Sequence, residues 1–109
     1  MIALGGSENY FGILIIWSVQ KQKIIKLLRI PNHMVYTVSF SPDDKTLASG
    51  SSDATIKLWN LETFAEIKTL SGHGGVVYSV SLSPDSQTLA SGSSDNMINL
   101  WNINDKHNM

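Results

Sequence analysis

The chain has 109 residues, enough for one small domain with a modest hydrophobic core. Eight Lys and Arg residues against nine Asp and Glu residues leave a net charge of −1, so we expect no attraction to nucleic acid or to an anionic membrane. Cysteine is absent, which excludes disulfides, a thiol nucleophile and a thiolate zinc site, and no apolar run approaches the roughly 20 residues of a membrane span.

The first part of the chain predicts three short strands. Residues 2–5 and a stretch ending at Trp17 form the first two, and residues 24–29 form the third. Three more residues separate the first two strands than separate the matching strands later in the chain. This insertion, near Asn9-Tyr10-Phe11, is expected to lengthen the turn between them.

The rest of the chain predicts seven more short strands. Val38 and Phe40 alternate with polar residues as in a half-buried strand, and the spacing of three from Val35 to Val38 predicts a β-bulge. The same spacing recurs from Val77 to Val80. Turns are expected at residues 41–44, 52–54, 83–86 and 94–96. The strands that the turns separate are Thr46–Ser51, Thr55–Asn60, 66–70, Thr88–Ser93 and 97–102.

An internal repeat organises these strands. When the sequence is laid on itself at an offset of 42, residues 35–60 fall on residues 77–102 with 19 of 26 positions identical and no gap. Trp17, Trp59 and Trp101 obey the same offset. A fixed period of this length indicates stacked or radially arranged repeat units.

The repeat resembles the WD-repeat β-propeller family, whose units run about 40–45 residues with four strands per blade. The resemblance rests on the period, the Gly72-His73 pair, the Ser-Pro-Asp turns and the tryptophan that closes each third strand. One departure is that Asn60 and Asn102 follow their tryptophans where the family has aspartate.

The resemblance implies an all-β fold, a partial β-propeller of four-stranded antiparallel blades with about two and a half blades in an open arc. The chain, 1–109, is then one propeller segment. It divides into a degenerate partial repeat at 1–29, a repeat at 30–71, and a repeat at 72–109 that lacks its last strand. The two outer faces of such an arc would expose apolar side chains to water.

The resemblance also implies a buried polar relay within each blade. The matching positions of the last unit are His73, Ser91, Asp95 and Trp101. Their hydrogen-bonding capacities suit one another, because the indole donates, the serine and the histidine can both donate and accept, and the carboxylate accepts. We expect a structural role, since each group would cost about 1–3 kcal/mol if buried unpaired.

The relay of the middle unit is incomplete. Ser49, Asp53 and Trp59 match, but Pro31 stands at the position of the histidine. Either the loop shifts to bring in His33, or the relay lacks its histidine, and the second interpretation is favoured.

A set of Ser, His and Asp also suggests a hydrolase, but the structural interpretation is stronger. The Ser and Asp recur in the middle unit, and no Gly-x-Ser-x-Gly elbow is present. We therefore predict no catalytic residues, no metal site and no cofactor.

By the same resemblance, partners are expected to contact the face formed by the tight turns and the starts of the first strands. The expected positions are Met34, Tyr36 and Ser52 in the middle unit and Val76, Tyr78 and Ser94 in the last. Tyrosine suits a binding face because it supplies contact area at a low cost in entropy. The alternative is that both tyrosines flank the seam between the blades.

The predicted function is a non-catalytic scaffold for protein–protein interaction, as a fragment of a WD-repeat propeller. The alternative is a recognition or regulatory segment of a larger multidomain signalling enzyme whose catalytic part lies outside this chain. Expected partners are other proteins or peptides, and either the remaining blades of a longer chain or copies of itself, because propellers close with about 4–8 blades. No secretory signal precedes the first strand, so a cytoplasmic location is expected.

Overall fold

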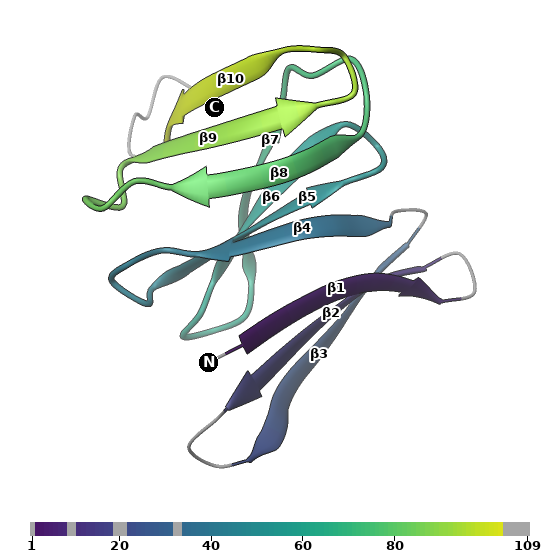
Figure 1. Ribbon diagram of the computed structural model, residues 1–109. Coiled ribbons are helices and arrows are strands. Elements are labelled where there is room, and N and C mark those ends of the chain that lie inside the picture. The colour runs from purple at the N-terminus through teal and green to yellow at the C-terminus, as the bar shows by residue number, and fades with distance from the viewer. Residues whose placement is uncertain (1, 9–10, 19–21, 32–33, 104–109) are drawn as a thin grey trace.

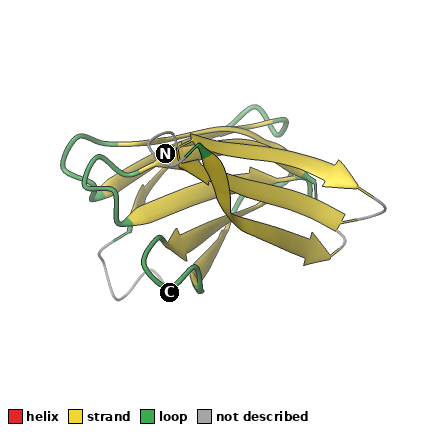
Figure 2. Cartoon of the chain, turned by 90° about the horizontal axis from the view of Figure 1, so that it is seen from below, coloured by secondary structure: helices red, strands yellow, loops and turns green. Residues whose placement is uncertain are grey.

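The computed structural model describes residues 2–8, 11–18, 22–31 and 34–103 (Figure 1). Ten strands within these ranges form three antiparallel sheets, and the ranges contain no helix that could cross a membrane. The sheets follow one another in chain order and fan out side by side (Figure 1). Loops and turns lie at the two ends of the strands (Figure 2). The prediction of an open all-β arc is confirmed.

The first sheet contains an extended hairpin. Its strands are β1 (Ile2–Glu8), β2 (Phe11–Ser18) and β3 (Lys23–Pro31), in the order β1-β2-β3. β1 and β2 pair without interruption from Ile2↔Trp17 to Glu8↔Phe11. The prediction of a longer turn is therefore wrong, because the insertion extends the paired part of the two strands. The large apolar residues of β2 favour extended structure.

The second and third sheets repeat one another. The second comprises β4 (Val35–Phe40), β5 (Thr46–Ser51), β6 (Thr55–Asn60) and β7 (Glu66–Ser71), in that order. The third comprises β8 (Val77–Leu82), β9 (Thr88–Ser93) and β10 (Ile98–Asn102), with β9 in the centre. The register shifts between Val35 and Thr37 and between Val77 and Ser79, which confirms both predicted bulges.

Two apolar seams join the sheets. The seam between the first and second sheets buries Ile16, Val35, Leu47, Trp59 and Leu61. The seam between the second and third buries Ala48, Ile56, Leu58, Leu70, Val77, Val80 and Leu89. Successive residues of a strand point to opposite faces, so Leu47 and Ala48 of β5 enter different seams. The second sheet is therefore covered on both faces.

A glycine in each seam allows the next sheet to approach. A Cβ atom on Gly5 would lie 2.4 Å from Val35 Cγ1, and a Cβ atom on Gly50 would lie 2.6 Å from Val77 Cγ1. Each glycine thus makes room for the valine that opens the first strand of the following sheet. We call this arrangement the valine socket.

Candidate functional site

A relay of four polar side chains ties the third sheet together. Trp101 Nε1 on β10 donates to Ser91 Oγ on β9 at 2.8 Å, and Ser91 Oγ lies 2.7 Å from His73 Nε2. His73 Nδ1 lies 3.0 Å from Asp95 Oδ2 in the tight turn. Ser91 is 1% exposed, and the side chain of His73 is fully buried. The structure thus brings the four expected residues into contact.

The directions of these hydrogen bonds follow from the carboxylate at the end of the relay. An ionised carboxylate only accepts, so His73 Nδ1 carries a hydrogen and donates a hydrogen bond to Asp95. Ser91 Oγ accepts from the indole of Trp101, and its hydrogen bond with Nε2 joins the serine to the histidine ring. The Ser91 hydroxyl is buried and forms its hydrogen bonds with other residues of the protein, which suits a structural role.

Backbone donors hold Asp95 in its ionised form. Gly74 N donates to Asp95 Oδ2 at 2.8 Å, and Met97 N donates to Asp95 Oδ1 at 2.8 Å. The bond from Gly74 contributes most, and with the bonds from Met97 and His73 it lowers the pKa of Asp95 from 3.8 to about 2, against the opposing effect of partial burial.

Acid should therefore destabilise the protein. A carboxyl with a lowered pKa in the folded state stabilises the fold above its unfolded value of 3.8, and this contribution is lost as the pH falls towards about 2. We expect the thermal midpoint to drop over this range. Asp95→Asn should lower the midpoint at neutral pH and show a smaller drop in acid.

Thermal unfolding of both proteins as a function of pH checks this expectation. Asp43 and Asp85 serve as an internal reference. Hydrogen bonds from the hydroxyls of Ser41 and Ser83 are the main causes of their lowered pKa values, and these bonds are present in the wild type and in Asp95→Asn alike. An acid drop of the same size in the wild type and in Asp95→Asn would contradict the assigned role of Asp95.

The second sheet contains part of the relay. Trp59 Nε1 donates to the buried Ser49 Oγ at 3.0 Å. Asp53 accepts within its own turn from Thr55 N at 3.1 Å and from Thr55 Oγ1 at 2.6 Å. Pro31 ends β3, and His33 lies outside the described residues. The choice between a shifted loop and a missing histidine stays a prediction.

The expected contact positions lie where each tight turn meets the start of a first strand. Met34 N donates to Ser52 Oγ at 2.9 Å, and Ser52 N donates back to Met34 O at 2.9 Å. In the third sheet, Ser94 N donates to Val76 O at 2.9 Å. These backbone bonds hold the turn and the strand start of each sheet together.

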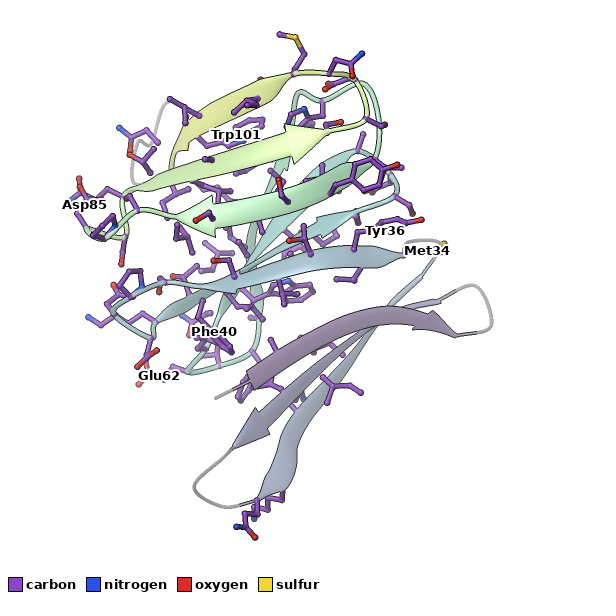
Figure 3. All side chains as sticks on the ribbon, viewed as in Figure 1. Met34, Tyr36, Phe40, Glu62, Asp85 and Trp101 are labelled. Carbon is purple, nitrogen blue, oxygen red and sulfur yellow. The ribbon has the colours of Figure 1, made fainter. Side chains whose placement is uncertain are left out.

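Two tyrosines join these sites across the second seam. The rings of Tyr36 and Tyr78 meet edge to face, with centroids 5.8 Å apart and an interplanar angle of 77°. They are nevertheless 47% and 57% exposed, and Met34 is 43% exposed. Figure 3 places Met34 and Tyr36 at the opposite end of the strands from Glu62 and Asp85. The tyrosines therefore flank the seam and also present free surface.

We call the end of the second and third sheets that carries the two tyrosines the top surface. It is defined by six positions at the tight turns and at the starts of the first strands of these sheets. They are Met34, Tyr36, Ser52, Val76, Tyr78 and Ser94.

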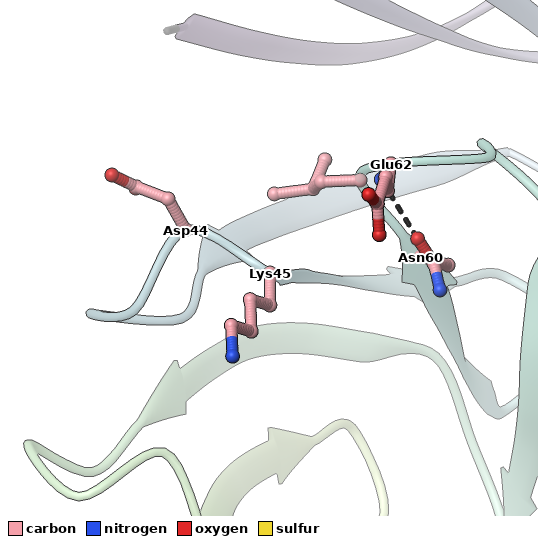
Figure 4. Close-up of a pocket in the computed structure, with 5 residues that line it drawn as sticks. Asp44, Lys45, Asn60 and Glu62 are labelled. Carbon is pink, nitrogen blue, oxygen red and sulfur yellow. Dashed lines mark hydrogen bonds between the residues drawn. The ribbon is translucent and has the colours of Figure 1, made fainter.

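A hollow at the other end of the second sheet has no counterpart among the predicted sites (Figure 4). Its volume is about 460 Å³, and it is lined by Asp44, Lys45, Asn60, Leu61 and Glu62. Asn60 Oδ1 accepts from Glu62 N at 2.7 Å and from Thr63 N at 3.1 Å. Asn60 thus caps the turn after β6. These are ordinary turn residues, so their spacing carried no signal of a site.

A metal centre finds no support in the part of the chain that the structure describes. No group of three or more His, Cys, Asp or Glu side chains there could hold a metal ion.

Comparison with known proteins agrees with this architecture. The family model described as "WD domain, G-beta repeat" matches residues 24–60 and 64–102. A solved structure described as "Crystal structure of RRP9 WD40 repeats" is similar, with a TM-score of 0.79 over 93% of this chain and 23% sequence identity. At that identity the likeness concerns the fold alone, and the chain spans 32% of the length of that protein. No curated protein matches the chain significantly.

Proposed function

The chain belongs to the WD-repeat family, and we propose that it is a non-catalytic scaffold that binds other proteins or peptides through its top surface. WD repeats are generally scaffolds for protein interaction. The observation that supports this function most is the exposed pair formed by Tyr36 and Tyr78. A cytoplasmic setting is part of the proposal, and a chain without cysteine is compatible with it.

The chemistry of the top surface suits a peptide with an apolar or aromatic anchor residue. Tyr36 and Tyr78 hold one another edge to face, so little side-chain freedom remains to be lost on binding. Met34 adds a flexible, polarisable side chain that adapts to irregular partners. Ser91 and His73 of the relay lie outside this surface, because both side chains are buried.

Peptides selected from a random library on the immobilised protein test this proposal. Their affinity for the double variant Tyr36→Ala/Tyr78→Ala should be at least about tenfold lower. Aromatic anchors at interfaces commonly contribute about 1.4 kcal/mol or more of binding energy, which corresponds to this factor. Glu62→Ala, at the opposite end of the strands, is the control and should leave the affinity unchanged. Peptides that bind the tyrosine variant as tightly as the wild type would refute the assignment.

A further inference from the structure

The top surface contains the same set of groups twice, once on the second sheet and once on the third. We propose that its partner is an extended peptide segment with two aromatic or large apolar anchor residues, two positions apart and next to a basic residue, so that one anchor lies on each tyrosine. This inference rests on the proposed function and specifies the partner that the same surface takes.

The two sets, which we call half-sites, match in side chains and in backbone hydrogen bonding. At the 42-residue offset Tyr36 falls on Tyr78, and Ser52 falls on Ser94. In each half-site the N–H of the turn serine donates, at 2.9 Å, to the carbonyl of the residue two positions before the tyrosine. A group of the partner that suits one half-site therefore suits the other.

The distance between the two tyrosines matches the repeat of an extended chain. The ring centroids of Tyr36 and Tyr78 lie 5.8 Å apart across the second seam, and both residues are exposed. In an extended chain, residues i and i+2 point to the same side and lie roughly 6.6–6.8 Å apart, because each residue adds about 3.3–3.4 Å. Residues i and i+1 point to opposite sides. One anchor on each tyrosine therefore requires a spacing of two positions.

The serine hydroxyls of the half-sites favour an extended partner over a helical one. Residues i and i+4 of a helix also lie close together, so the spacing of the tyrosines does not separate the two shapes by itself. Ser52 Oγ accepts from Met34 N at 2.9 Å and keeps its own hydrogen for a further acceptor, and Ser94 is exposed. An extended segment offers backbone carbonyls to such donors, whereas a helix uses its carbonyls internally.

The charge of the half-sites favours a basic residue beside the anchors. An aspartate, Asp53 or Asp95, directly follows the serine in each tight turn, and the turns and strand starts of both half-sites contain no Lys or Arg. The backbone N–H of Gly74 is the main cause that lowers the pKa of Asp95 to about 2, so this carboxyl is ionised at neutral pH. A Lys or Arg in the partner complements the net negative charge of these segments.

Synthetic peptides of different anchor spacing test the proposal on the unaltered protein. Each contains two Phe and one Lys in an alanine–serine background, with the Phe residues at i and i+1, i and i+2, or i and i+4, and a further peptide has a single Phe. In fluorescence anisotropy, the i, i+2 peptide should bind at least about tenfold more tightly than the others. Replacing its Lys by Glu should lower the affinity about two- to fivefold.

A double-mutant cycle between protein and peptide assigns the anchors. Tyr36→Ala should lower the affinity of the i, i+2 peptide about tenfold, but should not change the affinity of the peptide that lacks the anchor for Tyr36. Tyr78→Ala should give the same result with the other anchor. Both side chains are exposed, so we expect both variants to fold, and thermal unfolding checks this.

The outcomes separate this inference from the proposed function. Peptides that require the tyrosines but bind as tightly with one anchor, or bind best with anchors at i and i+4, would overturn the inference and leave the proposed function standing. A Glu peptide that binds as tightly as the Lys peptide would overturn the basic residue. Peptides that bind Tyr36→Ala/Tyr78→Ala as tightly as the wild type would overturn both the inference and the proposed function.

Discussion

Ile56→Ala should lower the free energy of unfolding by about 2–5 kcal/mol, whereas Ile98→Ala should change it by less than about 0.5 kcal/mol. The two isoleucines occupy the same repeat position on β6 and β10, and the first is buried while the second is exposed. Truncation of Ile56 removes apolar contacts and leaves a cavity in the second seam. Truncation of Ile98 removes a side chain that water already surrounds.

Urea denaturation of both variants measures this difference. The substitution and the repeat position are the same in both variants, although β6 is an interior strand of its sheet and β10 is an edge strand. Equal losses of stability would show that Ile98 is as well packed as Ile56, and would contradict the open outer face.

Ser91→Ala should be the most damaging change within the relay. It removes the partner of both Trp101 Nε1 and His73 Nε2, and each buried polar group left unpaired costs about 1–3 kcal/mol. Ser49→Ala is the matched variant in the second sheet, where the serine accepts from Trp59. We expect the loss for Ser91→Ala to exceed the loss for Ser49→Ala.

Chemical denaturation of the two serine variants and the wild type provides the comparison. The larger effect of Ser91→Ala arises because the buried histidine has a partner at Ser91 and another at Asp95, so that the network is coupled. A Ser91→Ala protein as stable as the wild type would refute a structural relay.

Much of the fold could be predicted because the chain contains two nearly identical units. The strand limits Thr46–Ser51 and Thr88–Ser93 follow from the predicted turns on either side of each strand. The two bulges follow from the spacing of the valines, since one extra residue breaks the two-residue period of a strand. Local patterns of this kind can be recognised from the sequence without knowledge of the three-dimensional structure.

Features that depend on pairing across the sheet could not be predicted. The insertion before Phe11 was visible as a count of residues, but a count does not distinguish a longer turn from a longer hairpin. Gly5 and Gly50 stand in the sequence as ordinary strand glycines. Their role as sockets requires knowing that Val35 and Val77 lie against them. The hollow near Asn60 likewise depends on how two turns approach each other.

The residues that build the arc differ from those of the proposed contact surface. The repeated segment around Ser91 supplies the relay and the seams, whereas the exposed tyrosines at the strand starts form the proposed contact surface. Repetition itself supports this division, because a unit that must pack against its neighbours needs the same interior each time.

A binding titration of Ser91→Ala with a peptide selected on the wild type tests this division most directly, at a temperature where the variant is folded. The account predicts an affinity within about twofold of the wild type, because a buried relay residue makes no contact with the peptide. A loss as large as that of Tyr36→Ala/Tyr78→Ala would contradict it and would place the relay within the binding site.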